Sequence, residues 1–170
     1  MWEVMCEAKN NWQPDSEQIA LKQSKKQAEQ FWASNKYDVM ARGYASYKQI
    51  SARYRDASTA ADYEAAMHSI SHTLSVLPYT MKGLRTSVEH MWGYVSKHVH
   101  EEERAVFQHI FDTLEWQSET SELEPDAFET AAPLLLLIQE FAIKYDVTYI
   151  KQTMANSFPR LAENHQQDHN

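Results

Sequence analysis

Residues 84–99 read LRTSVEHMWGYVSKHV and carry the clearest periodicity in the chain. Apolar side chains recur in this segment every three or four positions. When the segment is projected along a helix axis, these side chains fall within an arc of about 100°. They are Leu84, Val88, Met91, Trp92, Val95 and Val99. This spacing predicts an amphipathic helix that packs one face against a core.

The rest of the chain shows the same helical spacing. It predicts further helices over residues 16–42, 44–54, 60–77, 101–114, 125–142 and 146–156. Pro133 either lies within the sixth of the seven or splits it. Only three glycines and five prolines occur in 170 residues, too few for the many tight turns of a β-rich fold. The sequence therefore predicts an all-α fold, a compact bundle of about six to seven helices.

A chain of 170 residues has about the usual size of one domain. We place this single domain at residues 15–161, between an N-terminal extension, 1–14, and a polar tail, 162–170, which is expected to be disordered. The polar and acidic connection over residues 118–124 is expected to be a mobile loop.

Polar residues mark several expected helix starts. Asp15 or Ser16 is expected to accept a hydrogen bond from the first amides of the first helix. Thr59 and Asp62 have the spacing of a capping box. The carboxylates of residues 101–103 complement the dipole of the fifth helix.

Features of export or membrane insertion are missing from this sequence. The N-terminus lacks a basic segment followed by an apolar one. The longest apolar run, residues 131–138, is far short of the roughly 20 residues that cross a bilayer. Cys6 is the only cysteine and forms neither an internal disulfide nor a thiolate metal site. We therefore expect a cytoplasmic protein without a membrane partner.

Charge is distributed unevenly along the chain. The formal net charge of −8 argues against a generic nucleic-acid binder. Residues 20–60, however, hold eight basic side chains against three acidic ones, and residues 100–130 hold ten acidic side chains against Arg104 alone. This pattern is typical of solvated helix faces. It also fits a basic face that meets an anionic partner.

Sequence patterns for metal binding and catalysis are weak. Glu64, His68 and His72 project from one side of the third helix, but that side is opposite its apolar stripe, and no Glu-x-x-His pair occurs. Gly-rich phosphate loops, nucleophile elbows and His-Glu-x-x-His motifs are also missing. We expect no metal site and no cofactor, and the sequence favours a non-catalytic domain.

The outer face of the fourth helix is unusual. Thr86, His90, Gly93 and Lys97 follow one another along the side opposite the apolar stripe, with Tyr94 on the flank. A glycine inside an exposed helix costs about 1 kcal/mol relative to alanine. Two interpretations remain: another helix packs over Gly93, or the face binds a ligand.

Three segments give the chain a resemblance to the YbgA family, a bacterial helical domain of undefined function. The first is residues 35–43, with Lys36, followed by Tyr47. The second is residues 88–94, similar to the family's His-x-x-Gly-Tyr helix, followed by Glu103-Arg104. The third is Pro133-Leu134 followed by Tyr149, Gln152 and Pro159. The resemblance covers about residues 31–161.

Two positions depart from the family's pattern. The family's Ala-His-Ser is Ala41-Arg42-Gly43 in this chain, and Leu84 stands where the family has a second histidine. If those histidines belong to a site, the resemblance implies that the site is altered here, toward anion binding through Arg42.

Members of the family occur alone or fused to a desulfidase that acts on thiolated uracil, and the fusion implies that the helical domain helps to hold RNA. By this analogy we expect a non-catalytic domain that associates with RNA, tRNA above all. The expected contacts are Lys36, Arg42, Tyr47, His90, Lys97 and Gln152, and the outer face adds Thr86, Gly93 and Tyr94 as candidates.

Two alternatives remain. One is a protein-interaction module that uses the acidic loop and the surface around Gly93. The other is a small-molecule enzyme with His90 as acid or base beside Tyr94 or Glu89. A deep pocket around His90 would support the enzyme, and an open His90 face would count against it.

Overall fold

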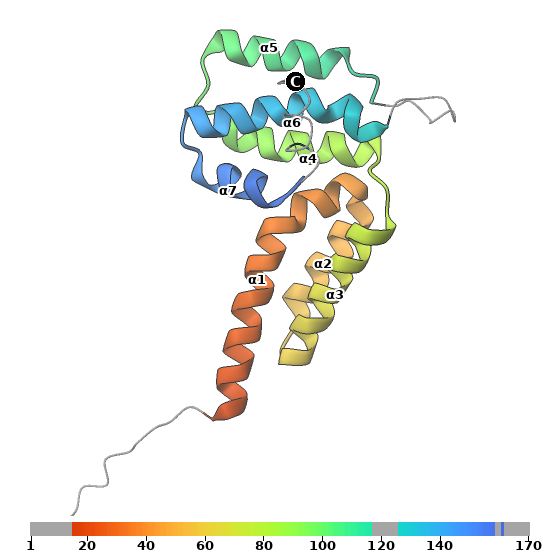
Figure 1. The fold of residues 1–170 in the computed structure, drawn as a ribbon, viewed down its shortest axis with the longest axis vertical. Coiled ribbons are helices and arrows are strands. Elements are labelled where there is room, and N and C mark those ends of the chain that lie inside the picture. The colour runs from red at the N-terminus through yellow and green to blue at the C-terminus, as the bar shows by residue number, and fades with distance from the viewer. Residues whose placement is uncertain (1–14, 117–125, 159–160, 162–170) are drawn as a thin grey trace, which may run out of the picture.

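A computed structural model describes residues 15–116, 126–158 and 161. Within these ranges the chain forms helices and no strand (Figure 1). The helices are α1 Ser16–Arg42, α2 Tyr44–Asp56, α3 Ala60–Val76, α4 Met81–Val95, α5 Glu101–Thr113, α6 Ala127–Lys144 and α7 Thr148–Asn156. The all-α bundle of six to seven helices is thus confirmed. The expected extension at 1–14, loop at 118–124 and tail at 162–170 lie outside the described residues.

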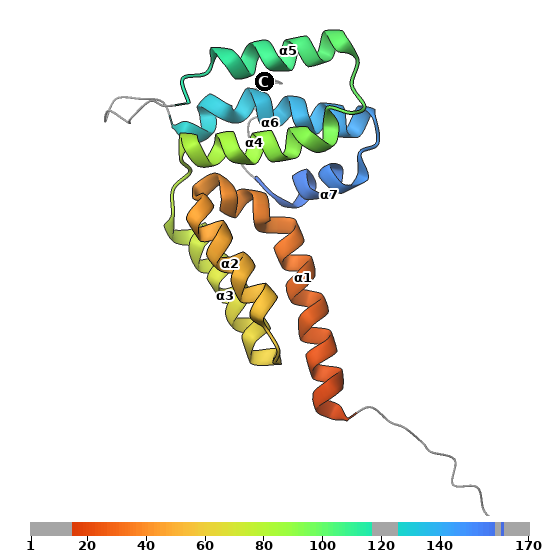
Figure 2. The same ribbon diagram turned by 180° about the vertical axis from the view of Figure 1, so that it is seen from behind.

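The helices form two groups. α4, α5 and α6 run side by side, with α7 next to them, and α1, α2 and α3 project from this layer in both views (Figures 1 and 2). The C-terminal part of α1 meets α4 and α7 where the two groups join, and α1 also packs along α2 and α3. None of the described helices is both long and apolar enough to cross a bilayer.

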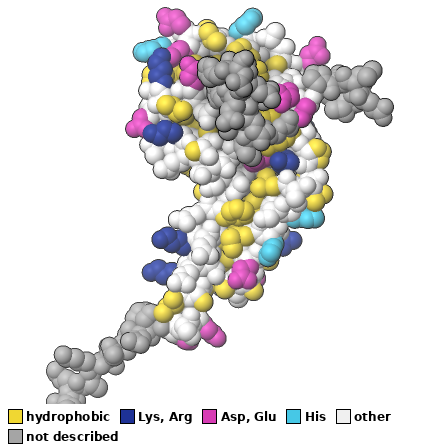
Figure 3. Space-filling view, viewed as in Figure 1, with side chains coloured by type: hydrophobic (Ala, Val, Ile, Leu, Met, Phe, Trp, Pro, Cys, Tyr) yellow, Lys and Arg dark blue, Asp and Glu magenta, His cyan; other side chains and the backbone are white. Residues whose placement is uncertain are grey.

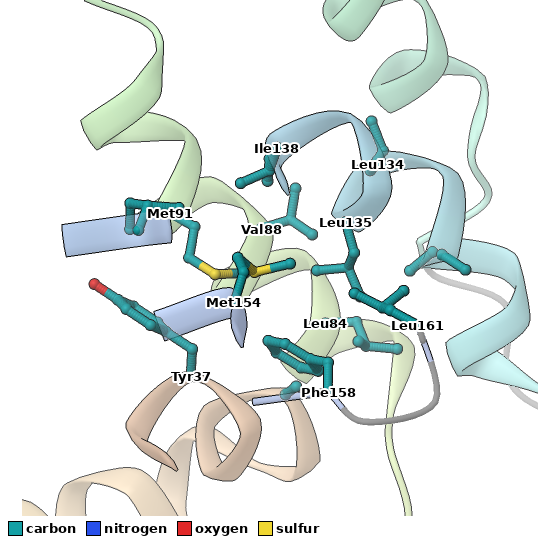
Figure 4. Packing of buried hydrophobic residues seen from close by; sticks show 14 of the residues in the cluster. Tyr37, Leu84, Val88, Met91, Leu134, Leu135, Ile138, Met154, Phe158 and Leu161 are labelled. Carbon is teal, nitrogen blue, oxygen red and sulfur yellow. The ribbon is translucent and has the colours of Figure 1, made fainter. Parts of the chain in front are cut away.

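Each group has its own apolar core, and α1 contributes to both. The larger core is built mainly from α4, α6 and α7, and Tyr37, Met40 and Ala41 of α1 belong to it (Figure 4). The smaller core contains Val39, Ile50 and Ile70, one from each of α1, α2 and α3. The end of α1 therefore holds the two groups together.

The expected apolar stripe of α4 is the center of the larger core. Leu84, Val88, Met91 and Val95 are fully buried. Trp92 is half-buried, and its ring stacks on Phe107 of α5 at 3.7 Å between centroids. This stack fixes α5 on the outside of the bundle.

The sequence spacing of the fifth helix also predicts the burial of Val106, Phe107, Ile110, Phe111 and Leu114, and the outer position of α5 corrects this prediction. Its side chains at Val106, Phe107, Ile110 and Phe111 have the spacing of a buried stripe, yet only Phe107 is buried, and Val106 is 52% exposed. α5 lies at the edge of the layer and packs on α6, so a single narrow line of side chains reaches the core (Figure 1).

The helix starts follow the sequence with one exception. Thr59 Oγ1 accepts a hydrogen bond from the Asp62 amide at 3.1 Å, and Asp62 Oδ2 accepts one from the Thr59 amide at 2.9 Å, which confirms the capping box. At Asp15 the expected side-chain bond is missing. Its backbone carbonyl instead accepts from the amides of Gln18 and Ile19. At the sixth helix, α6 continues unbroken through Pro133.

Glu103 joins α5 to the end of α6. Its carboxylate accepts hydrogen bonds from Lys144 Nζ, from the Tyr145 hydroxyl and, at 3.1 Å, from the His100 amide. These donors, Lys144 first, lower the pKa of Glu103 to about 2. The neighbouring Arg104 donates to the Ser96 carbonyl at 2.7 Å. Glu103 and Arg104, the acidic-basic pair of the resemblance, therefore both make contacts with other parts of the fold.

Replacing Glu103 by glutamine should lower the melting temperature at neutral pH. A carboxyl whose pKa is lower in the folded state than in the unfolded state stabilises the fold at pH values above its unfolded pKa. This contribution disappears as the pH falls through its folded pKa. The difference in melting temperature between wild type and Glu103→Gln should therefore have its full size above about pH 5 and disappear as the pH falls from about 4.5 to about 2. Thermal unfolding followed by circular dichroism measures it. Glu102→Gln, on an exposed neighbour, is the control, and a gap that stays constant down to pH 2 would contradict the assignment.

Candidate functional site

Residues from three distant parts of the sequence meet at the junction of α1, α4 and α7. Tyr37, Tyr94 and Tyr149, which we call the tyrosine cluster, come one from each of these helices. The rings of Tyr37 and Tyr149 meet edge to face at 6.5 Å, and those of Tyr94 and Tyr149 lie 5.0 Å apart. Figure 4 shows the Tyr37 hydroxyl pointing away from the leucines of the core. The cluster therefore lies at the border of the larger core.

The hydroxyl groups of the cluster are incompletely hydrogen-bonded. Burial raises the pKa of Tyr37, and the nearby hydroxyls of Tyr149 and Tyr94 raise it further. The Tyr149 hydroxyl is buried, yet no described residue gives it a hydrogen bond of good geometry. An unpaired buried hydroxyl costs about 1–3 kcal/mol. Such a group marks a place where a water molecule or a ligand atom fits.

Lys36 adds a positive charge to the cluster. Its ammonium lies 5.1 Å from the ring centroids of both Tyr37 and Tyr149. The two rings attract the cation without neutralising it. No carboxylate of the described residues pairs with Lys36, whereas Lys25, Lys144 and Lys151 have acidic partners. An anion can therefore approach the half-buried Lys36.

An open groove of about 480 Å³ adjoins Tyr149 between α1 and α7. Its lining is polar but uncharged. The residues are Gln30, Ala33, Ser34, Tyr149, Gln152, Thr153 and Asn156. Thr153 and Asn156 donate to carbonyls of their own helix. The side-chain amides of Gln30 and Gln152 form no hydrogen bond among the described residues, so they can both donate to and accept from a ligand.

The junction gathers three of the nine candidates from the sequence. Lys36 and Tyr94 contact Tyr149, and Gln152 lines the groove beside it. Their helices carry the three segments on which the family resemblance rests. Tyr37 and Tyr149 belong to the segments of the resemblance but were not among the nine candidates, although Tyr149 lies three positions before Gln152 on the same side of α7.

The outer face of α4 is open. No atom of the described residues lies within 4 Å of where a Cβ at Gly93 would be, so helix packing over Gly93 is the wrong interpretation. His90 and Lys97 are exposed, and Thr86 donates to the Lys82 carbonyl of its own helix at 3.0 Å. The glycine at which another backbone does approach α4 is Gly83.

His90 lacks the surroundings of a general acid or base. It is exposed and lines none of the grooves that we describe. An open imidazole without a pocket counts against the enzyme alternative. The described residues also contain no group of three His, Cys, Asp or Glu side chains that could hold a metal ion.

Arg42 lies outside the junction and is already engaged. Its Nε donates to Asp38 at 3.1 Å, and another guanidinium nitrogen donates to the Leu77 carbonyl. The guanidinium also stacks 4.1 Å from the ring centroid of Tyr79, and the side chain is only 15% exposed. These contacts join the end of α1 to the segment between α3 and α4, and they give no support to anion binding by Arg42.

Tyr47 is also outside the junction. It lies in a row of stacked rings between α1 and α2, 5.4 Å from Trp32 and 5.6 Å from Tyr44. Trp32 stacks in turn on Tyr54. Both faces of Tyr47 thus have ring neighbours, and only Tyr44 at the end of the row is exposed.

Replacing Tyr149 by phenylalanine should leave the fold as stable or raise its free energy of unfolding by up to about 1 kcal/mol, because the unpaired hydroxyl disappears while the ring stays. Tyr54→Phe is the matched control. The Tyr54 hydroxyl donates to the Ala28 carbonyl at 2.8 Å, so its loss should cost about 1 kcal/mol. Urea unfolding compares the two, and equal losses would show that the Tyr149 hydroxyl does have a partner.

Comparison with known proteins places the chain in a family. The pattern of that family matches residues 36–159, most of the chain, including the whole tyrosine cluster. This match is consistent with the resemblance to the YbgA family. No curated protein and no solved structure matches the chain. The chain belongs to the family described as proteins of unknown function, DUF1722.

Proposed function

We propose that this domain binds RNA without catalysing a reaction, and that a single-stranded part of the RNA docks at the junction of α1, α4 and α7. One observation carries the proposal. An exposed tyrosine ring, an unneutralised lysine and a groove of free side-chain amides lie next to one another at this junction. These are the groups with which proteins hold unpaired nucleotides.

Each group would contact a different part of a nucleotide. The Tyr94 ring is 45% exposed and offers a face on which a base can stack. Lys36 provides a positive charge for a phosphate. Gln30 and Gln152 can donate to and accept from the edge of a base. The Tyr149 hydroxyl would gain the partner that it lacks among the described residues.

The outer face of α4 extends this surface. His90 is one turn before Tyr94 on α4, Lys97 lies in the turn just beyond the end of α4, and both are exposed. Lys97 would contact a second phosphate. Gly93 leaves the helix backbone bare beside Tyr94, so a base or ribose can approach closely.

The net charge of −8 does not exclude this surface. Acidic side chains are concentrated in residues 100–130, whereas residues 20–60, which include most of α1, are mainly basic. Figure 3 shows Asp and Glu side chains mainly around the end of the molecule that α5 and α6 form. The resemblance to the YbgA family favours tRNA, whose unpaired ends and loops present such nucleotides.

Binding of a fluorescent single-stranded RNA and of tRNA, measured by anisotropy at rising salt, tests the proposal. Each phosphate neutralised on a single strand contributes about −0.7 to the slope of log K against log salt. Contacts from Lys36 and Lys97 together predict a slope of about −1.4. Absent or salt-independent binding would contradict the proposal, and purification of the chain with a protein instead of RNA would favour the interaction-module alternative.

A further inference from the structure

A second polar groove lies between α2 and α3, on helices that do not form the junction. It has a volume of about 390 Å³. Its lining consists of Ser46, Gln49, Ile50, Arg53, His68, Ser69, His72 and Thr73. Ile50 and Thr73 are buried and form the floor, and the other six side chains are polar.

Helical spacing explains why these groups face each other. Ser46, Gln49 and Arg53 are three and four positions apart and share one side of α2. His68 and His72 are one turn apart on α3, with Ser69 beside them. Because α2 packs along α3, the two polar sides meet above the buried side chains of Ile50 and Thr73. Figure 3 shows histidine side chains on the surface that these helices form.

The groove is positively charged and lacks a counterion. Arg53 is exposed and pairs with no acidic side chain of the described residues. No carboxylate lines the groove. Glu64 lines the neighbouring groove on the other side of His68, and Asp56 pairs with Arg55 at 3.1 Å. The Ser69 hydroxyl already donates to the Ala65 carbonyl of its own helix at 3.0 Å. The groove therefore offers the donors of Ser46, Gln49 and the two histidines around one uncompensated guanidinium.

This chemistry selects an anion over a metal ion. His68 and His72 are candidate metal ligands by residue type, but the sequence predicts no metal site. The guanidinium of Arg53 beside them also repels a cation. An arginine can hold two oxygens of a phosphate at once. Imidazole, hydroxyl and amide groups can donate to the remaining oxygens. We propose that the groove between α2 and α3 binds a phosphate group, with Arg53 as its main contact and His68 and His72 as flanking donors.

The site differs from the RNA surface in its helices and its residues, and it does not depend on the proposed function. The phosphate could belong to the RNA backbone or to a small phosphate compound. Both present the same tetrahedral oxyanion to Arg53, and a competition experiment separates them.

The test follows the side-chain NMR signals of His68, His72 and Arg53 in the full chain during titration with inorganic phosphate, at constant ionic strength set by chloride. Saturable shifts of these three residues are expected. Arg53→Met should weaken the binding about tenfold or more, because two charge-assisted hydrogen bonds are lost. Arg55→Met is the matched control, since Arg55 is exposed on the same helix but pairs with Asp56 outside the groove.

Shifts that are absent, that do not saturate, or that persist unchanged in Arg53→Met would overturn the proposal. If single-stranded RNA displaces phosphate and Arg53→Met also weakens RNA binding, the groove holds the RNA backbone. If phosphate binds and the RNA affinity of Arg53→Met equals that of wild type, the groove holds a small phosphate compound. Both results support the phosphate site, and only the first depends on RNA binding.

Discussion

Replacing Gly83 by alanine is expected to lower the free energy of unfolding by about 3 kcal/mol. A Cβ at this position would lie 2.4 Å from the Ala41 carbonyl oxygen and 2.8 Å from that of Met40, both backbone atoms. The backbone of α1 cannot move away cheaply, because the same Ala41 oxygen accepts from the Thr80 amide at 3.1 Å. Nearby, the buried Ser87 hydroxyl donates to the Tyr37 carbonyl at 2.8 Å.

Gly93→Ala is the control within the same helix and has the opposite expected sign. Its Cβ would meet nothing among the described residues, so alanine should raise the free energy of unfolding by about 0.5–1 kcal/mol through its helix propensity. Urea unfolding followed by circular dichroism gives both values. Equal effects of the two substitutions would show that α1 and α4 do not cross as closely as described.

A double variant, Lys36→Ala with Tyr94→Ala, is expected to weaken binding of single-stranded RNA by about 100-fold. Loss of one base–aromatic stack costs about 1–3 kcal/mol, and the loss of one phosphate contact adds to it. Each single variant should account for part of the loss. The slope of log K against log salt should also become shallower by about 0.7, because one lysine contact is missing. Anisotropy titrations at several salt concentrations measure both quantities.

The matched control is Lys22→Ala with Tyr44→Ala. Tyr44 is 43% exposed, close to the 45% of Tyr94, and Lys22 is an exposed lysine of α1 outside the junction. The control removes the same chemical groups from the surface of α1 and α2. A control that weakens binding as much as the junction variant would move the RNA site to the row of stacked rings that ends at Tyr44.

The elements of the fold could be predicted because local signals determine them. The stripe from Leu84 to Val95, the capping box at Thr59 and the break at Gly43 each depend on neighbours a few residues away. The exposure of Val106 could not be predicted in the same way. Its spacing suits a core, but α5 lies at the edge of the layer, and only the tertiary arrangement determines that.

The two glycines of α4 illustrate the same limit. The sequence marked Gly93 as unusual because a glycine inside a helix is costly, and helix packing over it was one interpretation. In the structure its surroundings are open. The sequence did not mark Gly83 as unusual, because it lies in the first turn of the helix. Its role depends on the backbone of residues 40 and 41, which are distant in sequence. Close approach between helices cannot be detected from one helix alone.

The candidate site was predicted in parts. Lys36, Tyr94 and Gln152 were each suggested by the resemblance, but no local pattern indicates that three helices bring them together. Tyr37 and Tyr149 lie in segments of the resemblance but were not among the expected contacts. Arg42 shows the reverse case, since an arginine in a basic segment suggests a ligand contact, whereas its guanidinium is held by Asp38 and Leu77.

The short segment of α1 from Tyr37 to Ala41 has a consequence for how the molecule melts. Tyr37, Met40 and Ala41 belong to the larger core and Val39 belongs to the smaller one. Neither group of helices can therefore unfold without removing contacts from the other. Two helical groups joined by a loop would separate into independent melting units. Here the division falls inside a helix, so we expect the described domain to unfold as one cooperative unit. A ligand that binds the folded α1 would then stabilise both groups of helices.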